Sequence, residues 1–158
     1  EDKAAAERFD LVAEARLRLK REDKLAERRG VGLKFLAEGS CEVEGDRESL
    51  LLALRNLVTN AIEWTPRGGG VELRIRPLGD GLEILVDDAG PGVPESERAT
   101  LFQPFHRGRT AEGRRVGFGL GLALTHSAVA AQGGTIEVED APLGGARFRV
   151  RLPLRNSA

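Results

Sequence analysis

Two asparagines, Asn56 and Asn60, stand in the run RNLVTNAIEWTP at residues 55–66, whose apolar residues otherwise follow the pattern of a buried helix. A spacing of four residues is about one helical turn, so the two carboxamides share a face. A carboxamide donates through its NH₂ group and accepts through its oxygen, but burying it without partners costs about 1–3 kcal/mol. Taken alone, the pair favours a helix surface, and on a buried face it requires a polar ligand.

A second candidate is the stretch VDDAGPGV at residues 86–93. The apolar strand ends at Val86, so the carboxylate of Asp88 projects from a strand end and could accept hydrogen bonds. Gly90 and Gly92 flank a proline and would allow the backbone to approach a planar ligand closely. The same residues fit a tight turn with a capping aspartate, and the stretch alone does not separate the two interpretations.

A third candidate is the glycine-rich stretch GFGLGL at residues 117–122. Glycines expose backbone N–H groups, and a following helix presents its positive N-terminal end, an arrangement that can bind phosphate. Close helix packing explains the glycines equally well. A dinucleotide-binding loop is excluded because the charged loop RGRTAEGRRV precedes the glycines instead of a strand, and the P-loop pattern is absent.

Two to four helices are expected to position these residues, and three stretches of the sequence indicate where they lie. Apolar residues at mostly three- and four-residue steps predict an amphipathic helix over 10–30. A second helix is expected to begin after an N-cap at Asp46 and to end near Thr65-Pro66. A third, rich in small residues, is expected over 120–134.

Strands are indicated by alternation of apolar and polar residues. Hairpins are predicted over 71–86 and 135–153, and short strands on both sides of a Gly-Ser turn at 39–40. The polar segment 87–117 is long for a compact domain and typical of a binding loop or lid. These elements predict an α+β fold: a two-layer α/β sandwich with a mostly antiparallel mixed sheet covered on one face by helices.

Composition limits the classes of function. The 158 residues, 41% of them hydrophobic, suffice for one domain with a core. The 24 Lys and Arg balance 25 Asp and Glu, so the formal charge of −1 gives no long-range attraction for nucleic acid or an anionic membrane. One cysteine and no apolar run near the roughly 20 residues of a membrane span indicate a reducing, aqueous compartment. The start without methionine predicts a piece of a longer protein.

Four stretches, in this order and spacing, resemble the boxes of the ATP-binding catalytic domain of sensor histidine kinases. That family also contains the ATPase domains of Hsp90, MutL and DNA gyrase. Residues 56–65 resemble the N box, 88–92 the G1 box, 101–107 the F box and 117–122 the G2 box. The resemblance covers residues 9–153 and implies an α/β sandwich that binds ATP between its helices and a mobile lid.

The resemblance also implies the roles of single residues. Asn60 would give its carboxamide oxygen to Mg²⁺, and Asn56 would hydrogen-bond the phosphate or a metal-bound water. Asp88 would accept a hydrogen bond from the adenine amino group, and Trp64 would stack on adenine. Arg107 would reach the γ-phosphate, and it completes the implied catalytic set with the two asparagines. The full set of implied nucleotide-binding residues is Asn56, Asn60, Trp64, Asp88, Gly90, Gly92, Val93, Phe105, Arg107, Gly117, Phe118, Gly119, Leu120, Gly121 and Leu122.

The lid implied by the resemblance spans residues 107–118 and is anchored by Phe102 and Phe105. It is expected to be mobile without nucleotide and to be ordered in part by the phosphates. The lid carries further phosphate candidates, of which at least two fit a solvated basic loop better: Arg109, Arg114 and Arg115.

One position departs from the family pattern. These kinases commonly carry a basic residue three positions after the metal-binding asparagine, and this chain has Glu63, whose repulsion from phosphate would cost about 1–3 kcal/mol. The side chain could instead turn outward and pair with Arg67. This departure puts phosphoryl transfer in question more than nucleotide binding. His106 and His126 are expected to be surface or packing residues rather than phosphoacceptors.

The resemblance favours the catalytic domain of a two-component sensor kinase, which transfers the γ-phosphoryl group of ATP to a histidine on a dimerisation element outside the fragment. Alternatives are a nucleotide-binding module with reduced or lost kinase activity and an anti-sigma-type serine kinase. A hydrolase of the Hsp90 kind is disfavoured because Asn56 stands where those ATPases have a catalytic glutamate.

The resemblance also sets the expected organisation. Residues 1–8 would end the preceding dimerisation element, 9–154 would form the ATP-binding domain, and 155–158 would be a tail. The expected partners are the dimerisation domain and a response regulator, with no nucleic acid. The fragment is expected to be monomeric and the full-length protein a homodimer, with this domain in the cytoplasm.

Overall fold

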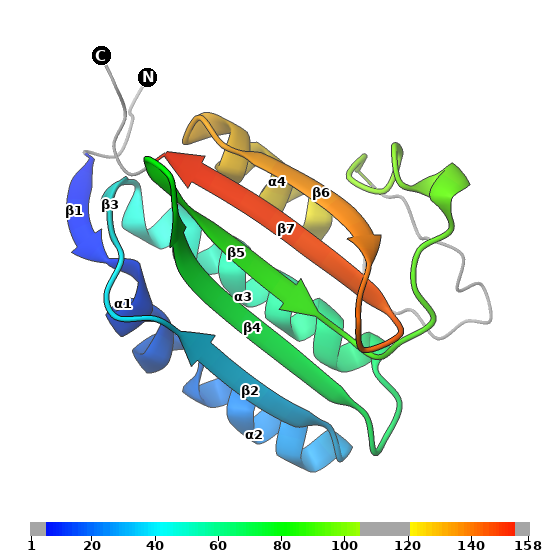
Figure 1. Ribbon diagram of the computed structural model, residues 1–158. Helices are drawn as coiled ribbons and strands as arrows, with labels where there is room; N and C mark the ends of the chain where they lie inside the picture. Colours follow the sequence, from blue (N-terminus) through cyan, green and yellow to red (C-terminus); the bar gives the residue numbers. More distant parts are fainter. Residues whose placement is uncertain (1–5, 105–120, 154–158) are drawn as a thin grey trace.

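A sheet and a layer of helices make up the computed structural model, which describes residues 6–104 and 121–153. The five-stranded sheet has the order β2-β4-β5-β7-β6, and the helices cover one of its faces (Figure 1). Only the β2–β4 pair is parallel among the described strands of this sheet. The predicted α+β sandwich with a mostly antiparallel mixed sheet is therefore confirmed. The elements in order are β1 (Glu7–Asp10), α1 (Leu11–Arg18), α2 (Lys20–Arg29), β2 (Gly32–Ala37), β3 (Glu42–Gly45), α3 (Arg47–Trp64), β4 (Gly70–Leu78), β5 (Gly81–Asp87), a 3₁₀ turn (Glu95–Glu97), α4 (Gly121–Ala131), β6 (Thr135–Asp140) and β7 (Ala146–Pro153).

Helix α3 is the central helix of the layer and begins where the sequence predicts. The side chain of Asp46 caps it by accepting a hydrogen bond from the Ser49 amide at 3.2 Å. Apolar residues at helical spacing then face the sheet, from Leu50 to Ile62, which is fully buried. The helix ends at Thr65, whose amide closes the last turn on Ala61 at 3.2 Å. Its position fixes the direction in which the two asparagines point.

The predicted continuous helix over 10–30 is wrong, because the structure contains two helices that meet at Leu19. Leu19 has φ −97° and ψ 12°, outside helical values, and its side chain is buried. Asp10 starts α1 by accepting from the amides of Val12 and Cys41.

The strands β1 and β3 form a separate two-stranded sheet in which Glu7 pairs with Gly45. The runs on both sides of the Gly-Ser turn do become strands, but β2 joins the large sheet and β3 joins β1. Glu7 and Arg8 belong to this small sheet, although the predicted domain boundary stood at residue 9. The nature of the segment before it stays a prediction.

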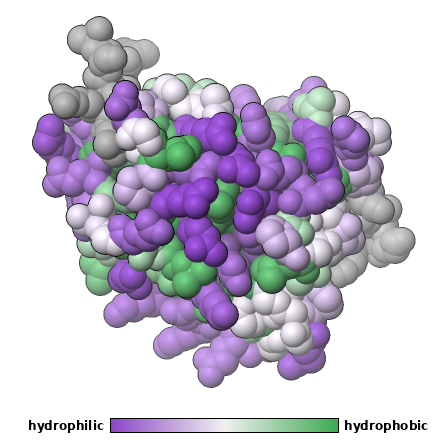
Figure 2. Space-filling model, viewed as in Figure 1, coloured by the Kyte–Doolittle hydropathy of each residue, from purple (hydrophilic) through white to green (hydrophobic). Residues whose placement is uncertain are grey.

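The face of the sheet that the helices leave open carries a network of ion pairs, and Figure 2 shows hydrophilic side chains gathered on this side. Glu83 is only 1% exposed and accepts hydrogen bonds from Arg76, Arg149 and Arg151. Burial alone would raise the pKa of Glu83, but these three guanidinium groups outweigh it and the pKa is lowered. Among the described residues, no helix combines the length and apolar character that crossing a bilayer requires.

Candidate functional site

The two asparagines of α3 lie on its partly exposed side, next to the beginning of α4. Asn56 Nδ2 donates to the carbonyl oxygen of Gly121 at 3.5 Å, a long hydrogen bond. This contact joins the predicted N box to the last described part of the predicted G2 box. Leu122, the next residue, is partly buried against the core. The structure therefore brings together two stretches that lie 65 residues apart.

Asn60 is one helical turn before Trp64, and the two side chains are in contact. The indole N–H of Trp64 donates to Asn60 Oδ1 at 3.1 Å. A carbonyl oxygen has two lone pairs, so this bond leaves one for a metal ion. No cluster of three or more His, Cys, Asp or Glu side chains in the described part could hold a metal. The remaining lone pair of Asn60 Oδ1 would fit Mg²⁺ that is shared with phosphate, because one neutral oxygen suffices when the ligand brings the charge.

Asp88 lies directly after β5 and is 3% exposed. Its Oδ1 accepts from the backbone amides of Gly90 at 2.9 Å and Ala146 at 3.0 Å. Burial raises the pKa of Asp88, the two amide hydrogen bonds offset part of that rise, and the neighbouring Asp87 carboxylate adds to it. Within residues 6–104 and 121–153, no group donates a hydrogen bond to Oδ2. That oxygen is available to a ligand.

The turn after Asp88 is held by close backbone approaches. A Cβ added to Gly90 would lie 2.7 Å from the carbonyl oxygen of Trp64, so only glycine fits there. Gly92 has φ +81°, a left-handed conformation that favours glycine. Val93 is partly buried, and its carbonyl accepts from Arg98 Nε at 2.9 Å. The structure places these three predicted residues together, in the turn that follows Asp88.

Three residues of this region had no role in the site predicted from the sequence. Thr65 Oγ1 accepts from the Ala89 amide at 3.2 Å, and the Gly145 amide donates to the carbonyl oxygen of Asp88 at 3.1 Å. A Cβ on Gly145 would overlap Asp88 Oδ1, and Ala146 supplies one of the amides that bind that oxygen. The glycine pair at 144–145 indicated only a hairpin turn. Its proximity to Asp88 follows from the pairing of β7 with β5, which the sequence does not encode locally.

Several implied residues lie outside the described part of the chain. They include the aromatic Phe105, the charged Arg107 and the glycine-box residues before α4. Their roles stay predictions, as do those of the lid arginines and His106. The residues concerned are Phe105, His106, Arg107, Arg109, Arg114, Arg115, Gly117, Phe118, Gly119 and Leu120.

Phe102, expected to anchor the lid, packs between the sheet and α4. Its ring meets Phe148 edge-on with centroids 6.2 Å apart, and the ring of His126 at 5.5 Å. His126 is thus a packing partner on the exposed side of α4. The Arg67 side chain lies against Gly30, and its expected pairing with Glu63 stays a prediction.

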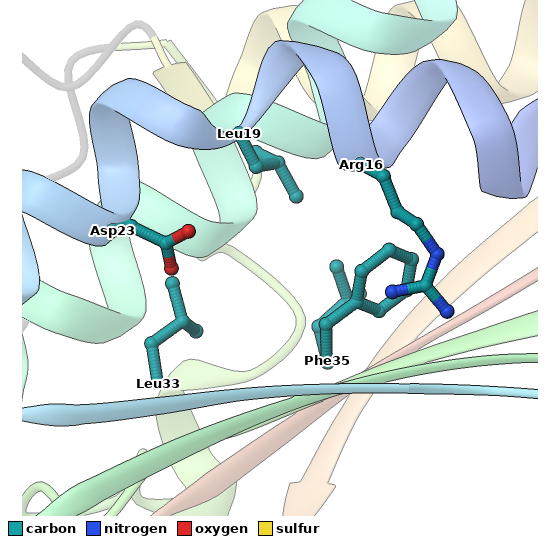
Figure 3. Close-up of a pocket in the computed structure, with 6 residues that line it drawn as sticks. Arg16, Leu19, Asp23, Leu33 and Phe35 are labelled. Carbon is teal, nitrogen blue, oxygen red and sulfur yellow. The ribbon is translucent and has the colours of Figure 1, made fainter.

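A separate cavity of about 180 Å³ lies between the two N-terminal helices and the edge strand β2 (Figure 3). The guanidinium carbon of Arg16 lies 4.5 Å from the ring centroid of Phe35 at one side of it. Those residues predicted to bind nucleotide that the structure describes come from α3, the start of α4 and the segment after β5, so this cavity is a different place. Its lining residues are Arg16, Leu19, Asp23, Leu33, Phe35 and Leu73.

Comparison with known proteins agrees with this geometry. The family described as histidine kinase-, DNA gyrase B- and HSP90-like ATPase matches residues 45–156. The sensor-type histidine kinase PrrB of Mycobacterium tuberculosis is 41% identical over 116 residues, which cover 72% of this chain and 25% of PrrB. This chain thus spans about a quarter of the length of that curated relative.

Solved structures show the same fold. The mycobacterial sensor histidine kinase MprB matches with a TM-score of 0.85 and 30% identity, over 96% of this chain and 100% of that one. The full-length ShkA structure in complex with AMPPNP matches with a TM-score of 0.84 and 27% identity, over 99% of this chain and 33% of ShkA.

Proposed function

The chain belongs to the histidine kinase-, DNA gyrase B- and HSP90-like ATPase family as the catalytic ATP-binding domain of a sensor histidine kinase, and we propose that it transfers the γ-phosphoryl group of Mg-ATP to a histidine of a separate dimerisation element. The observation that carries the proposal is the burial and hydrogen bonding of the Asp88 carboxylate. Its carboxylate is buried at a strand end, with one oxygen fixed by two amides and the other available. That arrangement suits an amino group such as the one on adenine.

The nucleotide would lie between Asp88 and the asparagines of α3. Oδ2 of Asp88 accepts from the adenine amino group, and the Gly90–Val93 turn borders the base. Asn60 would hold the metal through its carboxamide oxygen, and Asn56 would hydrogen-bond phosphate. When bound, Mg²⁺ neutralises phosphate charge.

The chain itself has mainly a positioning role in the transfer. The imidazole of the acceptor is the nucleophile, so no strong base is required within this domain. Arg107 would contribute positive charge at the γ-phosphate, and the glycine-box residues and Phe105 would contact the nucleotide. A bound AMPPNP in ShkA supports adenine nucleotides as the ligand class.

For the whole protein, we propose a homodimer that acts with a response regulator as a separate partner. The proposal rests on PrrB and MprB, which are sensor histidine kinases, and on the part of PrrB that this chain covers. We propose a cytoplasmic position for this domain, where ATP is available. The division into a preceding dimerisation element, an ATP-binding domain that ends at residue 154 and a tail at 155–158 belongs to the same proposal, with the first strand of the domain beginning at Glu7 rather than at the predicted residue 9.

The proposal is tested by mixing the 158-residue chain with γ-labelled ATP, with and without a two-helix histidine element from the same protein. Acid-labile, base-stable label is expected on the added element only, because neither His106 nor His126 is expected to reach an in-line position. Asn60→Ala should abolish the label by removing the metal ligand. ATP binding without any transfer would favour a nucleotide-binding module in which Glu63 has cost catalysis, and label on the chain alone would contradict the proposal.

A further inference from the structure

We infer that Thr65 is a positioning residue that determines base selectivity, because its hydroxyl ties the Asp88–Gly90 turn to the C-terminal end of α3. The inference rests on the proposed function, since it assigns adenine to Asp88. Thr65 contacts neither the base nor the metal in this scheme. It acts through the backbone amide of Ala89.

Asp88 can discriminate between bases only if its free oxygen has a fixed direction. Two amides hold Oδ1, one from Gly90 in the same turn and one from Ala146 on β7. The Gly145 amide holds the Asp88 carbonyl at 3.1 Å from the same hairpin. All these bonds connect the turn to itself or to the sheet. None connects it to the helix that carries the metal side of the site.

Thr65 supplies that connection. Its Oγ1 accepts from the Ala89 amide at 3.2 Å, while its own amide closes the last turn of α3 on Ala61. Thr65 is 5% exposed, so the acceptor is held in a confined space. The connection spans 24 residues of sequence and joins the base side of the site to the helix of the two asparagines.

The methyl group of Thr65 lies beside Gly69, where an added Cβ would come within 2.6 Å of Thr65 Cγ2, and a Cβ on Gly90 would lie 2.7 Å from the Trp64 carbonyl oxygen. The two glycines thus let the turn approach the end of α3 closely, and with the methyl group beside Gly69 the hydroxyl of Thr65 accepts from the Ala89 amide. A valine at position 65 would put a methyl group in place of the acceptor. That methyl group would also exclude a water molecule that could replace the hydroxyl.

Loss of the acceptor should act on ATP and not on GTP. Without its partner the Ala89 amide is left unpaired, the turn relaxes, and Oδ2 of Asp88 loses its direction toward the amino group. Guanine has an oxygen in place of that amino group and gains nothing from Oδ2. The preference for ATP over GTP should therefore fall by about fivefold to tenfold, the worth of one net hydrogen bond.

The test is calorimetric titration of Mg-ATP and Mg-GTP into the 158-residue chain and its variants. Thr65→Val should lower the ATP-to-GTP preference by about fivefold to tenfold, and Thr65→Ser, which keeps the hydroxyl, should keep that preference within about twofold of the parent. Ile62→Val is the matched control, because it shortens a fully buried side chain near the same helix end and leaves the hydroxyl in place. It should lower the melting temperature without changing the ratio of the two affinities.

Two further measurements separate the possible outcomes. Asp88→Asn combined with Thr65→Val should show no further loss of preference beyond Asp88→Asn alone, because both act on one contact. If the valine variant does not fold, Thr65→Ala removes the same acceptor without adding a methyl group. A parent that binds ATP and GTP equally contradicts the proposed function. A parent that prefers ATP together with a Thr65→Val chain that keeps the full preference overturns this inference alone.

Discussion

Replacing Asp88 by asparagine should invert base recognition rather than merely weaken it, and the reason is the pair of amides on Oδ1. The Gly90 and Ala146 amides, at 2.9 and 3.0 Å, both need an acceptor at that position. An asparagine must therefore keep its oxygen there and place its NH₂ group where Oδ2 was. The group that faced the adenine amino group as an acceptor becomes a donor.

The magnitude follows from the bond that is lost. A hydrogen bond to a charged acceptor contributes about 1.5–3 kcal/mol, and two opposed donors add to the loss. We expect Asp88→Asn to weaken Mg-ATP binding by about 2–3 kcal/mol, or about 30- to 150-fold. Mg-GTP binding should improve, because the new NH₂ group can donate to the oxygen of guanine.

Calorimetry with both nucleotides measures this change, and the neighbouring carboxylate provides a matched control. Asp87→Asn removes the same charge one residue earlier, but Asp87 pairs with Arg147 at 2.7 Å. That variant should lose stability and keep the preference for ATP. If Asp88→Asn bound ATP as tightly as the parent, Asp88 would not be the adenine contact.

The raised pKa of Asp88 adds a pH dependence to the same experiment. As the pH falls from neutral toward that raised pKa, a proton is expected on Oδ2, because two amides already occupy Oδ1. The ATP-to-GTP preference of the parent should then decrease, and that of Asp88→Asn should stay constant. Using the ratio removes the contribution of phosphate protonation, which the two nucleotides share. Lower pH should have the opposite effect on the free energy of unfolding. A carboxyl group whose pKa is raised in the folded state stabilises that state more as the pH falls.

Three other predictions follow from the described residues. Glu83→Gln should lower the free energy of unfolding by about 2–4 kcal/mol in denaturant titrations, whereas Glu72→Gln, whose ion pair is more exposed, should change it by less than about 1 kcal/mol. Because the pKa of Glu83 is lowered, the difference from the parent should be complete above the ordinary glutamate pKa of about 4.3 and should disappear as the pH falls through the lower folded value. Gly145→Ala should weaken Mg-ATP binding at least about tenfold, since a Cβ there meets the adenine-side carboxylate, and Gly32→Ala, which meets nothing within 4 Å, should not. Emission of Trp64, the one tryptophan of the chain, should change on saturation with Mg-ATP, and an unchanged spectrum would argue against contact of the indole with the nucleotide site.

Local patterns predicted the elements that periodicity determines. The N-cap at Asp46, the end of α3 and the two hairpins all depend on residues close in sequence, and all are present. The two-layer fold follows from them, because a sheet with one apolar face needs a helix layer to cover it. The resemblance of four stretches to the boxes of a known family then indicated the candidate site.

The errors and omissions concern contacts between distant segments. The break between α1 and α2 lies at Leu19, and the sequence has no glycine or proline there that would indicate a helix end. The pairing of β3 with β1 depends on a strand that starts only at Glu7. Thr65 and Gly145 resemble an ordinary helix stop and an ordinary turn. Their roles appear only when β5, β7 and α3 end at the same place.

Nucleotide binding should connect several elements of the domain, because the ends of β5 and α3 and the start of β7 meet at the base side of the site. Asp88 follows β5, Gly145 precedes β7 and Thr65 ends α3, so the base side of the site is built from one strand end, one hairpin and one helix end. Asn56 adds the start of α4 through Gly121. A nucleotide that contacts Asp88 and both asparagines therefore links the sheet to α3 and α4 at once. Binding should stabilise the helix layer against the sheet, and weakening the Thr65 contact should reduce that stabilisation for ATP more than for inorganic phosphate.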